Sequence, residues 1–102
     1  MKQEIPVTIT PKALKEAKKI FTTKNIPSNY GLRIGIKGSV GCAGANFIIG
    51  FDTEETNDST FLINEVKIII NKGHYLYLAG QEIDFVSTNE EQGFVFTKEN
   101  NN

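Results

Sequence analysis

The chain has 102 residues and a formal net charge of −1, with 39% hydrophobic and 23% charged residues. These proportions are ordinary for a globular protein and exclude wholesale disorder, and the length is that of one domain. We therefore expect a single domain over residues 1–102. A charge balance so close to zero gives no general attraction for phosphate backbones, so nucleic acid is not an expected partner.

Cys42 is the only cysteine of the chain. No disulfide can therefore form within the chain, and we expect an intracellular, cytoplasmic protein. Residues 1–6 hold no apolar stretch of signal-peptide length. The longest apolar runs, such as residues 68–70, are far too short to cross a bilayer, so no membrane association is expected.

A helix is predicted to begin after Thr10, whose side chain suits an N-cap, with Pro11 at a position where its missing N–H costs nothing. Apolar residues then recur at three- and four-residue spacing, with lysines between them. These apolar residues are Ala13, Leu14, Ala17, Ile20 and Phe21. We interpret the segment as an amphipathic helix that covers a sheet. Its lysines form a solvated face or, less commonly, a docking surface.

From Leu32 onward the hydrophobic period changes to two, which predicts strands over residues 32–36 and 47–51. The two residues 64–65, Asn-Glu, connect two apolar runs and predict a hairpin. Two closing strands are predicted over residues 83–86 and 94–96.

Residues 52–60 are polar and acidic and predict a surface loop, and the polar tail 97–102 is expected to fray. A short helical turn is predicted over residues 74–78, ended by Gly80. The order of elements predicts an α+β fold. We expect a mainly antiparallel sheet with one N-terminal amphipathic helix and a second short helix.

The first candidate site is Cys42, which is surrounded by Gly38, Gly41 and Gly44. Glycines let successive backbone N–H groups converge on one point, an arrangement that stabilises a thiolate. The functional interpretation is a metal ligand or a redox-active thiol. The alternative is a small, inert, buried residue in a tight turn. The local composition favours neither interpretation.

The sequence gives weaker support for nucleotide binding and for catalysis by other residues. The glycine spacing loosely matches a dinucleotide-binding loop, but a strand rather than a helix is predicted to follow it, and no Gly-Lys-Ser/Thr completes a P-loop. The lone histidine, His74, suits a metal ligand or a general base, although such residues more often serve in packing. Asp84 lies in a predicted strand and is expected to face solvent or to cap a turn. Because no nucleophile–base pair can be identified, we do not expect an enzyme.

Several short motifs, each weak alone, follow one another in a specific order and spacing. They are residues 7–10, residues 31–38, Gly41-Cys42-Ala43-Gly44, residues 66–71, Tyr77-Leu78-Ala79-Gly80, Ile83-Asp84-Phe85 and Gly93-Phe94-Val95-Phe96. This succession resembles the HesB/IscA-like family, the A-type iron–sulfur carriers. The resemblance implies a compact β-rich fold, a homodimer or higher oligomer, and binding of iron or of a [2Fe–2S] or [4Fe–4S] cluster for delivery to other proteins.

The resemblance assigns Cys42 to the first cysteine of the family. It implies a cofactor site at Cys42, Gly41 and Gly44, with Cys42 as the metal ligand. The family's other two cysteines form a Cys-x-Cys pair after an Asn-Pro-Asn segment. The equivalent segment here is residues 98–100, and the pair is absent. Asn71 stands where the family usually has aspartate.

A cluster usually takes about four protein ligands, mostly thiolates. Two copies of Cys42 in a symmetric dimer supply two of them. The rest would come from a small thiol, from a partner protein or from donors such as His74. A simple homodimer is therefore not expected to hold a stable all-cysteine cluster.

Three functional hypotheses follow. The first is a divergent carrier that holds iron or a labile cluster through Cys42 and has iron–sulfur assembly or acceptor proteins as partners. The second is an interaction or regulatory module of the same fold that has lost cluster binding and has no cofactor. The third is a thiol-redox protein that uses Cys42 alone.

Overall fold

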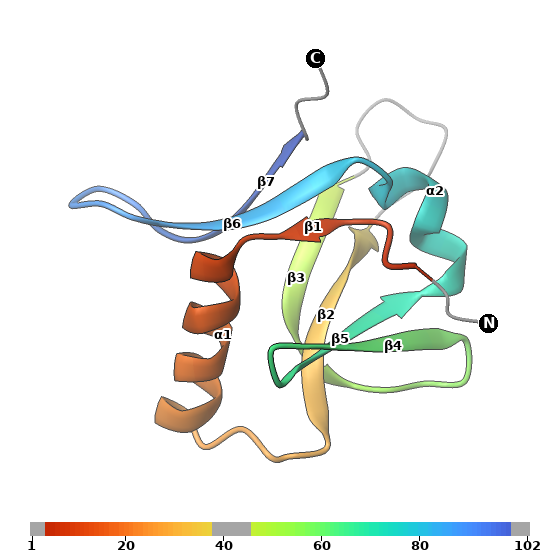
Figure 1. Cartoon of the computed structure of the whole chain (residues 1–102), viewed down its shortest axis with the longest axis horizontal. Helices are drawn as coiled ribbons and strands as arrows, with labels where there is room; N and C mark the ends of the chain where they lie inside the picture. Colours follow the sequence, from red (N-terminus) through yellow and green to blue (C-terminus); the bar gives the residue numbers. More distant parts are fainter. Residues whose placement is uncertain (1–3, 38–45, 99–102) are drawn as a thin grey trace.

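The computed structural model describes residues 4–37 and 46–98, which form two sheets and an N-terminal helix around one core (Figure 1). A four-stranded sheet has the strand order β3-β2-β5-β4, and a three-stranded sheet has the order β1-β6-β7. The strands of the larger sheet are β2 (Tyr30–Lys37), β3 (Asn46–Thr53), β4 (Asp58–Ile63) and β5 (Val66–Asn71). Those of the smaller sheet are β1 (Thr8–Ile9), β6 (Gln81–Ser87) and β7 (Gln92–Lys98).

Helix α1 (Pro11–Thr23) begins as the sequence predicts. The hydroxyl of Thr10 accepts a hydrogen bond from the Ala13 N–H at 3.1 Å, which satisfies one of the free donors of the first turn. Ala13, Leu14 and Ala17 are buried in the core, and the small alanines let the helix approach the sheets closely. The predicted amphipathic helix is confirmed.

The core of the larger sheet comes from alternate residues of β2 and from β5. Leu32 and Ile34 of β2 are fully buried, as are Ile68 and Ile70 of β5. These two strands run parallel, whereas β2 and β3 run antiparallel along their whole length, up to the pair Lys37↔Asn46. Three of the five strand pairs are antiparallel, which confirms the mainly antiparallel sheet.

The structure tests the predictions made for one hairpin, one loop and the C-terminal tail. The hairpin at Asn64 and Glu65 is confirmed, and both residues have positive φ angles of 48° and 70°. The predicted surface loop over residues 52–60 is too long, because β3 continues to Thr53 and β4 already begins at Asp58. The tail was also predicted too long, since β7 extends to Lys98. Residues 99–102 lie outside the described chain.

A short helical segment follows β5, as predicted. It consists of the 3-10 turn η1 (Lys72–His74) and helix α2 (Tyr75–Leu78), and Gly80 follows with a φ of 84°. Within residues 4–37 and 46–98, no helix is long and apolar enough to cross a membrane. The two-residue strand β1 was not predicted, because so short a strand has no periodicity of its own.

Candidate functional site

The predicted site residues Cys42, Gly41 and Gly44 lie in the segment 38–45, outside the described residues. The structure does show where this segment joins the sheet. Lys37 ends β2, Asn46 begins β3, and the two residues are paired across the ladder. The groups around this end of the sheet are therefore the described part of the candidate site.

His74 lies beside the last residues of β2. Its Nδ1 accepts a hydrogen bond from the backbone N–H of Ile36 at 3.3 Å. A Cβ atom added to Gly35 would stand 2.9 Å from the same nitrogen, so the absence of a side chain there is what admits the imidazole. In a neutral ring whose Nδ1 accepts, the proton is on Nε2. This contact agrees with the packing interpretation of the lone histidine.

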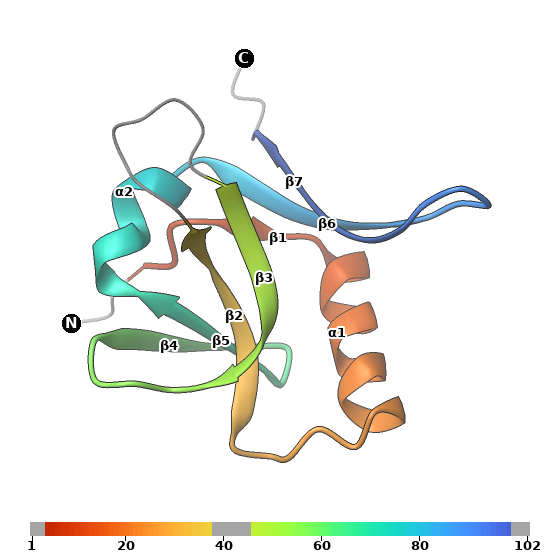
Figure 2. The same ribbon diagram turned by 180° about the vertical axis from the view of Figure 1, so that it is seen from behind.

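An aromatic stack joins the two sheets at the same end of the molecule. The rings of Phe47 in β3 and Phe96 in β7 have their centroids 5.0 Å apart and their planes 16° apart. The stack brings the start of β3, directly after segment 38–45, beside the end of β7 (Figure 2). The strand that follows segment 38–45 and the strand that ends at Lys98 therefore meet at this end of the molecule.

A charged cluster on β2, β3 and β4 was not found from the sequence. Arg33 donates to Asp52 at 2.7 Å and, through two nitrogens, to Asp58 at 2.9 and 2.6 Å. It also donates to the carbonyl of Thr53 at 2.9 Å. The Asp58 side chain is only 1% exposed, and the guanidinium beside it lowers the pKa of that carboxyl. The paired carboxylates in turn raise the pKa of Arg33.

This cluster is structural rather than a metal site, because its charges already neutralise one another through a two-pronged arginine contact. Among the described residues, no group of three or more histidine, cysteine, aspartate or glutamate side chains is placed to hold a metal ion. The donors in this part of the chain therefore do not fit a closed metal site. The side chain of Asn71, where the resembling family usually has aspartate, caps η1 by accepting from the Gly73 N–H at 2.8 Å.

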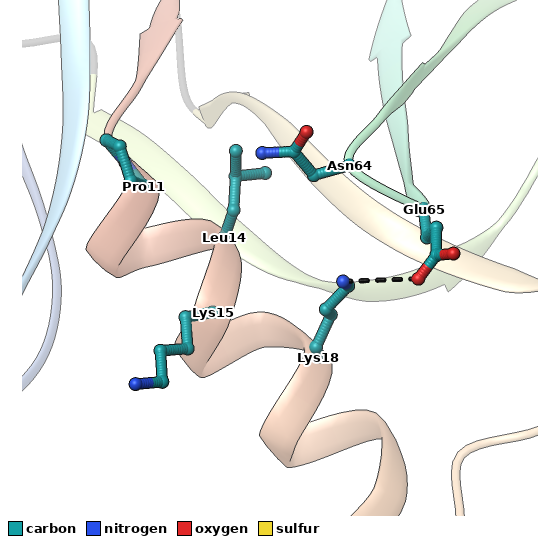
Figure 3. Close-up of a pocket in the computed structure, with 6 residues that line it drawn as sticks. All are labelled: Pro11, Leu14, Lys15, Lys18, Asn64 and Glu65. Atoms are coloured by element: carbon teal, nitrogen blue, oxygen red, sulfur yellow. Dashed lines mark ion pairs between the residues drawn. The ribbon is translucent and has the colours of Figure 1, made fainter.

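A surface pocket of about 480 Å³ lies between α1 and the turn that joins β4 to β5 (Figure 3). It is lined by Pro11, Leu14, Lys15, Lys18, Asn64 and Glu65. Its only carboxylate, that of Glu65, is ion-paired with the Lys18 ammonium at 3.2 Å. Among the described residues, its lining holds no serine, threonine, cysteine or histidine, so it contains no paired nucleophile and base of the kind that these residues form.

The described residues form a β-rich α+β domain in which segment 38–45 connects the paired strands β2 and β3. The crystal structure of SufA from Escherichia coli matches the chain with a TM-score of 0.73 at 27% identity, over 90% of this chain and 79% of that chain. A crystal structure titled as IscA with the [2Fe-2S] cluster has the same fold, with a TM-score of 0.73 at 20% identity over 90% and 84% of the two chains.

The sequence comparisons define the family. The family model described as iron-sulphur cluster biosynthesis matches residues 5–102. The iron-binding protein IscA of Enterobacter sp. (strain 638) is 36% identical over 78 residues, which are 76% of this chain and 72% of that protein. The chain belongs to this iron–sulfur cluster biosynthesis family, the HesB/IscA family. The resemblance and the fold class expected from the sequence are thereby confirmed.

Proposed function

We propose that the protein acts in iron–sulfur cluster assembly as a carrier that holds iron or a labile cluster through Cys42. The observation that carries the proposal is the position of this single cysteine. It stands in the Gly41-Cys42-Ala43-Gly44 motif between two paired strands, in a chain that the family model matches over residues 5–102. Iron or the cluster is the cargo, and Gly41 and Gly44 shape the backbone that stabilises the thiolate.

Because the chain supplies few ligands, it holds iron or a cluster only weakly. One chain provides one thiolate, and the described residues provide no cluster of further donors. The Nδ1 of His74 is already engaged by the Ile36 N–H. Outside thiols, from glutathione or from a partner protein, therefore complete the coordination. A cargo held in this way is released easily, which suits delivery to an acceptor protein.

The proposal includes a cellular location and a set of partners. The protein works in the cytoplasm, without an enzymatic step, and its partners are a second copy of the chain and other iron–sulfur assembly or acceptor proteins. The IscA relative is named for iron binding, and the solved IscA structure is titled with a [2Fe-2S] cluster. These names support iron or a cluster as the cargo.

The test is anaerobic reconstitution. The protein is incubated with iron, sulfide and glutathione, desalted, and examined for visible absorption and bound iron beside Cys42→Ala and the control Ser39→Ala. We expect absorption and bound iron in the parent and in Ser39→Ala, and loss of both in Cys42→Ala. Circular dichroism should show that all three proteins are folded. Equal iron in Cys42→Ala and the parent would contradict the proposal.

A second candidate function is an interaction or regulatory module of the same fold. The presence of only one cysteine favours it, because a cluster usually takes about four ligands. This function predicts that neither the parent nor Cys42→Ala retains iron, while the purified chain still binds iron–sulfur assembly proteins in a direct binding assay.

A further inference from the structure

The surface pocket between α1 and the β4–β5 turn has a wall of mixed character on its helix side (Figure 3). Pro11 and Leu14 are apolar, and Lys15 and Lys18 carry positive charge. These four residues share one face of α1, because positions three, four and seven apart lie on the same side of a helix. The two turn residues line the other wall. The helix therefore offers a narrow apolar floor beside two ammonium groups.

Positive charge is concentrated on α1. Its 13 residues include four lysines and a single glutamate, so the helix carries a charge of +3. The whole chain has a net charge of −1, so the remaining residues together carry −4. The apolar residues Ala13, Leu14 and Ala17 are buried in the core, whereas the four lysines are exposed. The helix is therefore a localised positive surface on a protein that is otherwise acidic.

A carboxylate of the chain itself already lies on this surface. Glu65 Oε1 is 3.2 Å from Lys18 Nζ, and the two side chains are 86% and 46% exposed. An ion pair this exposed contributes little stability, because water and salt screen it. A carboxylate from another molecule can therefore replace that of Glu65. Lys15 makes no ion pair within residues 4–37 and 46–98, so its charge is available to the same molecule.

The β4–β5 turn holds Glu65 in an unfavourable backbone conformation. Its φ of 70° lies in the left-handed region. Glycine is strongly preferred at the second position of a two-residue hairpin turn, because it lacks the Cβ that this conformation crowds. Asn64, with a φ of 48°, belongs to a residue type that tolerates the region. The backbone would be less strained with glycine at position 65, so what the glutamate contributes is its carboxylate at the pocket.

We propose that the pocket binds an acidic segment of a partner protein. One carboxylate of the segment replaces Glu65 on Lys18, a second pairs with Lys15, and an apolar side chain of the segment packs on Leu14. Glu65 acts as an internal competitor, so a segment with several acidic residues binds and a single carboxylate does not displace it. The interaction needs neither Cys42 nor a metal, and it therefore goes beyond the carriage of iron.

Two other anionic partners fit this surface less well. A helix that binds a bilayer inserts an apolar face, whereas the apolar face of α1 is buried in the core. A nucleic acid presents a long row of phosphates, which the negative charge of the rest of the chain and of Glu65 opposes. A short acidic segment needs only the pocket and the two lysines beside it.

The first test measures how a fluorescein-labelled peptide, two repeats of Glu-Leu-Asp, binds the iron-free protein at low salt by fluorescence anisotropy. Lys15→Glu is compared with Lys72→Glu, which makes the same charge change on an exposed residue of η1, away from α1 (Figure 1). We expect saturable binding to the parent and to Lys72→Glu, and at least about tenfold weaker binding to Lys15→Glu. A parent that does not bind the peptide would overturn the proposal, as would equal losses in the two variants.

The second test removes the internal competitor. Glu65→Gln keeps the size of the side chain and frees Lys18, so the peptide should bind about threefold tighter than to the parent. Glu65→Gly should bind the peptide as tightly as Glu65→Gln, and it should unfold at no lower urea concentration than the parent, because glycine relieves the backbone. Unchanged or weaker binding in Glu65→Gln would contradict the competition.

The third test separates a protein partner from other anions and from the carrier function. A peptide with glutamine and asparagine in place of the acidic residues should not bind. Vesicles of phosphatidylglycerol and a DNA duplex are measured beside the acidic peptide, and equally tight binding of either would overturn the choice of a protein segment. Cys42→Ala should bind the acidic peptide as the parent does, so failure of the carrier function leaves these results unaffected.

Discussion

The Thr10 hydroxyl donates a hydrogen bond to the carboxylate of Asp84 in β6, with Oγ1 and Oδ1 2.8 Å apart, although the two residues are 74 positions apart in the sequence. The same hydroxyl oxygen accepts from the Ala13 N–H, and the Thr10 N–H donates to the carbonyl of Ile83 at 3.0 Å. From the sequence, Asp84 is expected to face solvent or to cap a turn; in the structure its carboxylate supports Thr10, the N-cap residue of α1. The bonds from Thr10 and from the Phe85 N–H lower the pKa of Asp84.

Thr10→Ala should lower the free energy of unfolding by about 1–2 kcal/mol, because it removes both the helix cap and the link to Asp84. Urea denaturation measures the loss. Thr10→Ser keeps the hydroxyl and should retain most of the stability. A serine variant as unstable as the alanine variant would show that the hydroxyl is not the stabilising group.

Asp58→Ala should cost about 3 kcal/mol of unfolding free energy, since it leaves the largely buried Arg33 without its two-pronged partner. Asp52→Ala is the matched control. Its side chain is 48% exposed and makes one contact with Arg33, so a loss below about 1 kcal/mol is expected. Equal losses in the two variants, measured by urea denaturation, would argue against a dominant role for the buried pair.

Acid should destabilise the protein through three carboxyl groups. Contacts with Arg33 and backbone N–H groups lower the pKa values of Asp52 and Asp58, and the bond from Thr10 lowers that of Asp84. A carboxyl group whose pKa is lower in the folded state contributes stability above its unfolded pKa of about 3.9. That contribution is lost as the pH falls through the lower, folded pKa. Thermal unfolding between pH 6 and pH 2 should show a decline below about pH 4.

The Asp58→Asn variant checks the source of this acid sensitivity. Asparagine does not titrate, so the variant should be less stable at neutral pH and lose less stability on acidification than the parent. An identical pH profile in the parent and the variant would exclude Asp58 as a contributor.

Gly35→Ala should destabilise the protein by about 1–2 kcal/mol, because the new Cβ would stand 2.9 Å from His74 Nδ1 and displace the ring from the Ile36 N–H. Gly50→Ala, with nothing within 4 Å of its new Cβ, should change stability by less than about 0.5 kcal/mol. Both variants are compared by urea denaturation. A Gly35→Ala variant that loses no more stability than Gly50→Ala would contradict the close packing of His74 on Gly35.

His74→Ala separates packing from metal binding at this position. The variant should lose about 1 kcal/mol of unfolding free energy with the hydrogen bond to Ile36, yet retain the Cys42-dependent absorption after reconstitution. Unchanged stability with loss of bound iron would instead make His74 a ligand.

The elements that could be predicted from the sequence carry local signals. The Thr10-Pro11 start of α1 and the alternation from Leu32 depend on neighbouring residues, and so does the hairpin at residues 64–65. The Arg33–Asp58 pair had no such signal, because an arginine in an alternating strand also suits an exposed face.

The candidate site also has some features with a local sequence signal and others that depend on contacts between distant residues. Its cysteine motif could be found by local residue order, whereas the contact of His74 with Ile36 joins residues 38 positions apart and required the fold. The stack of Phe47 on Phe96 likewise depends on how the two sheets meet.

The pairing of β1 with β6 also bears on how the chain folds. Thr8 aligns with Glu82, so the first strand has no partner until most of the chain has been synthesised. The β2–β3 and β4–β5 hairpins can form earlier from nearby residues. Pairs so distant in sequence slow folding, because a long loop must close before the contact stabilises it. Docking of the N-terminal strand is therefore expected to be a late event, after β6 has left the ribosome.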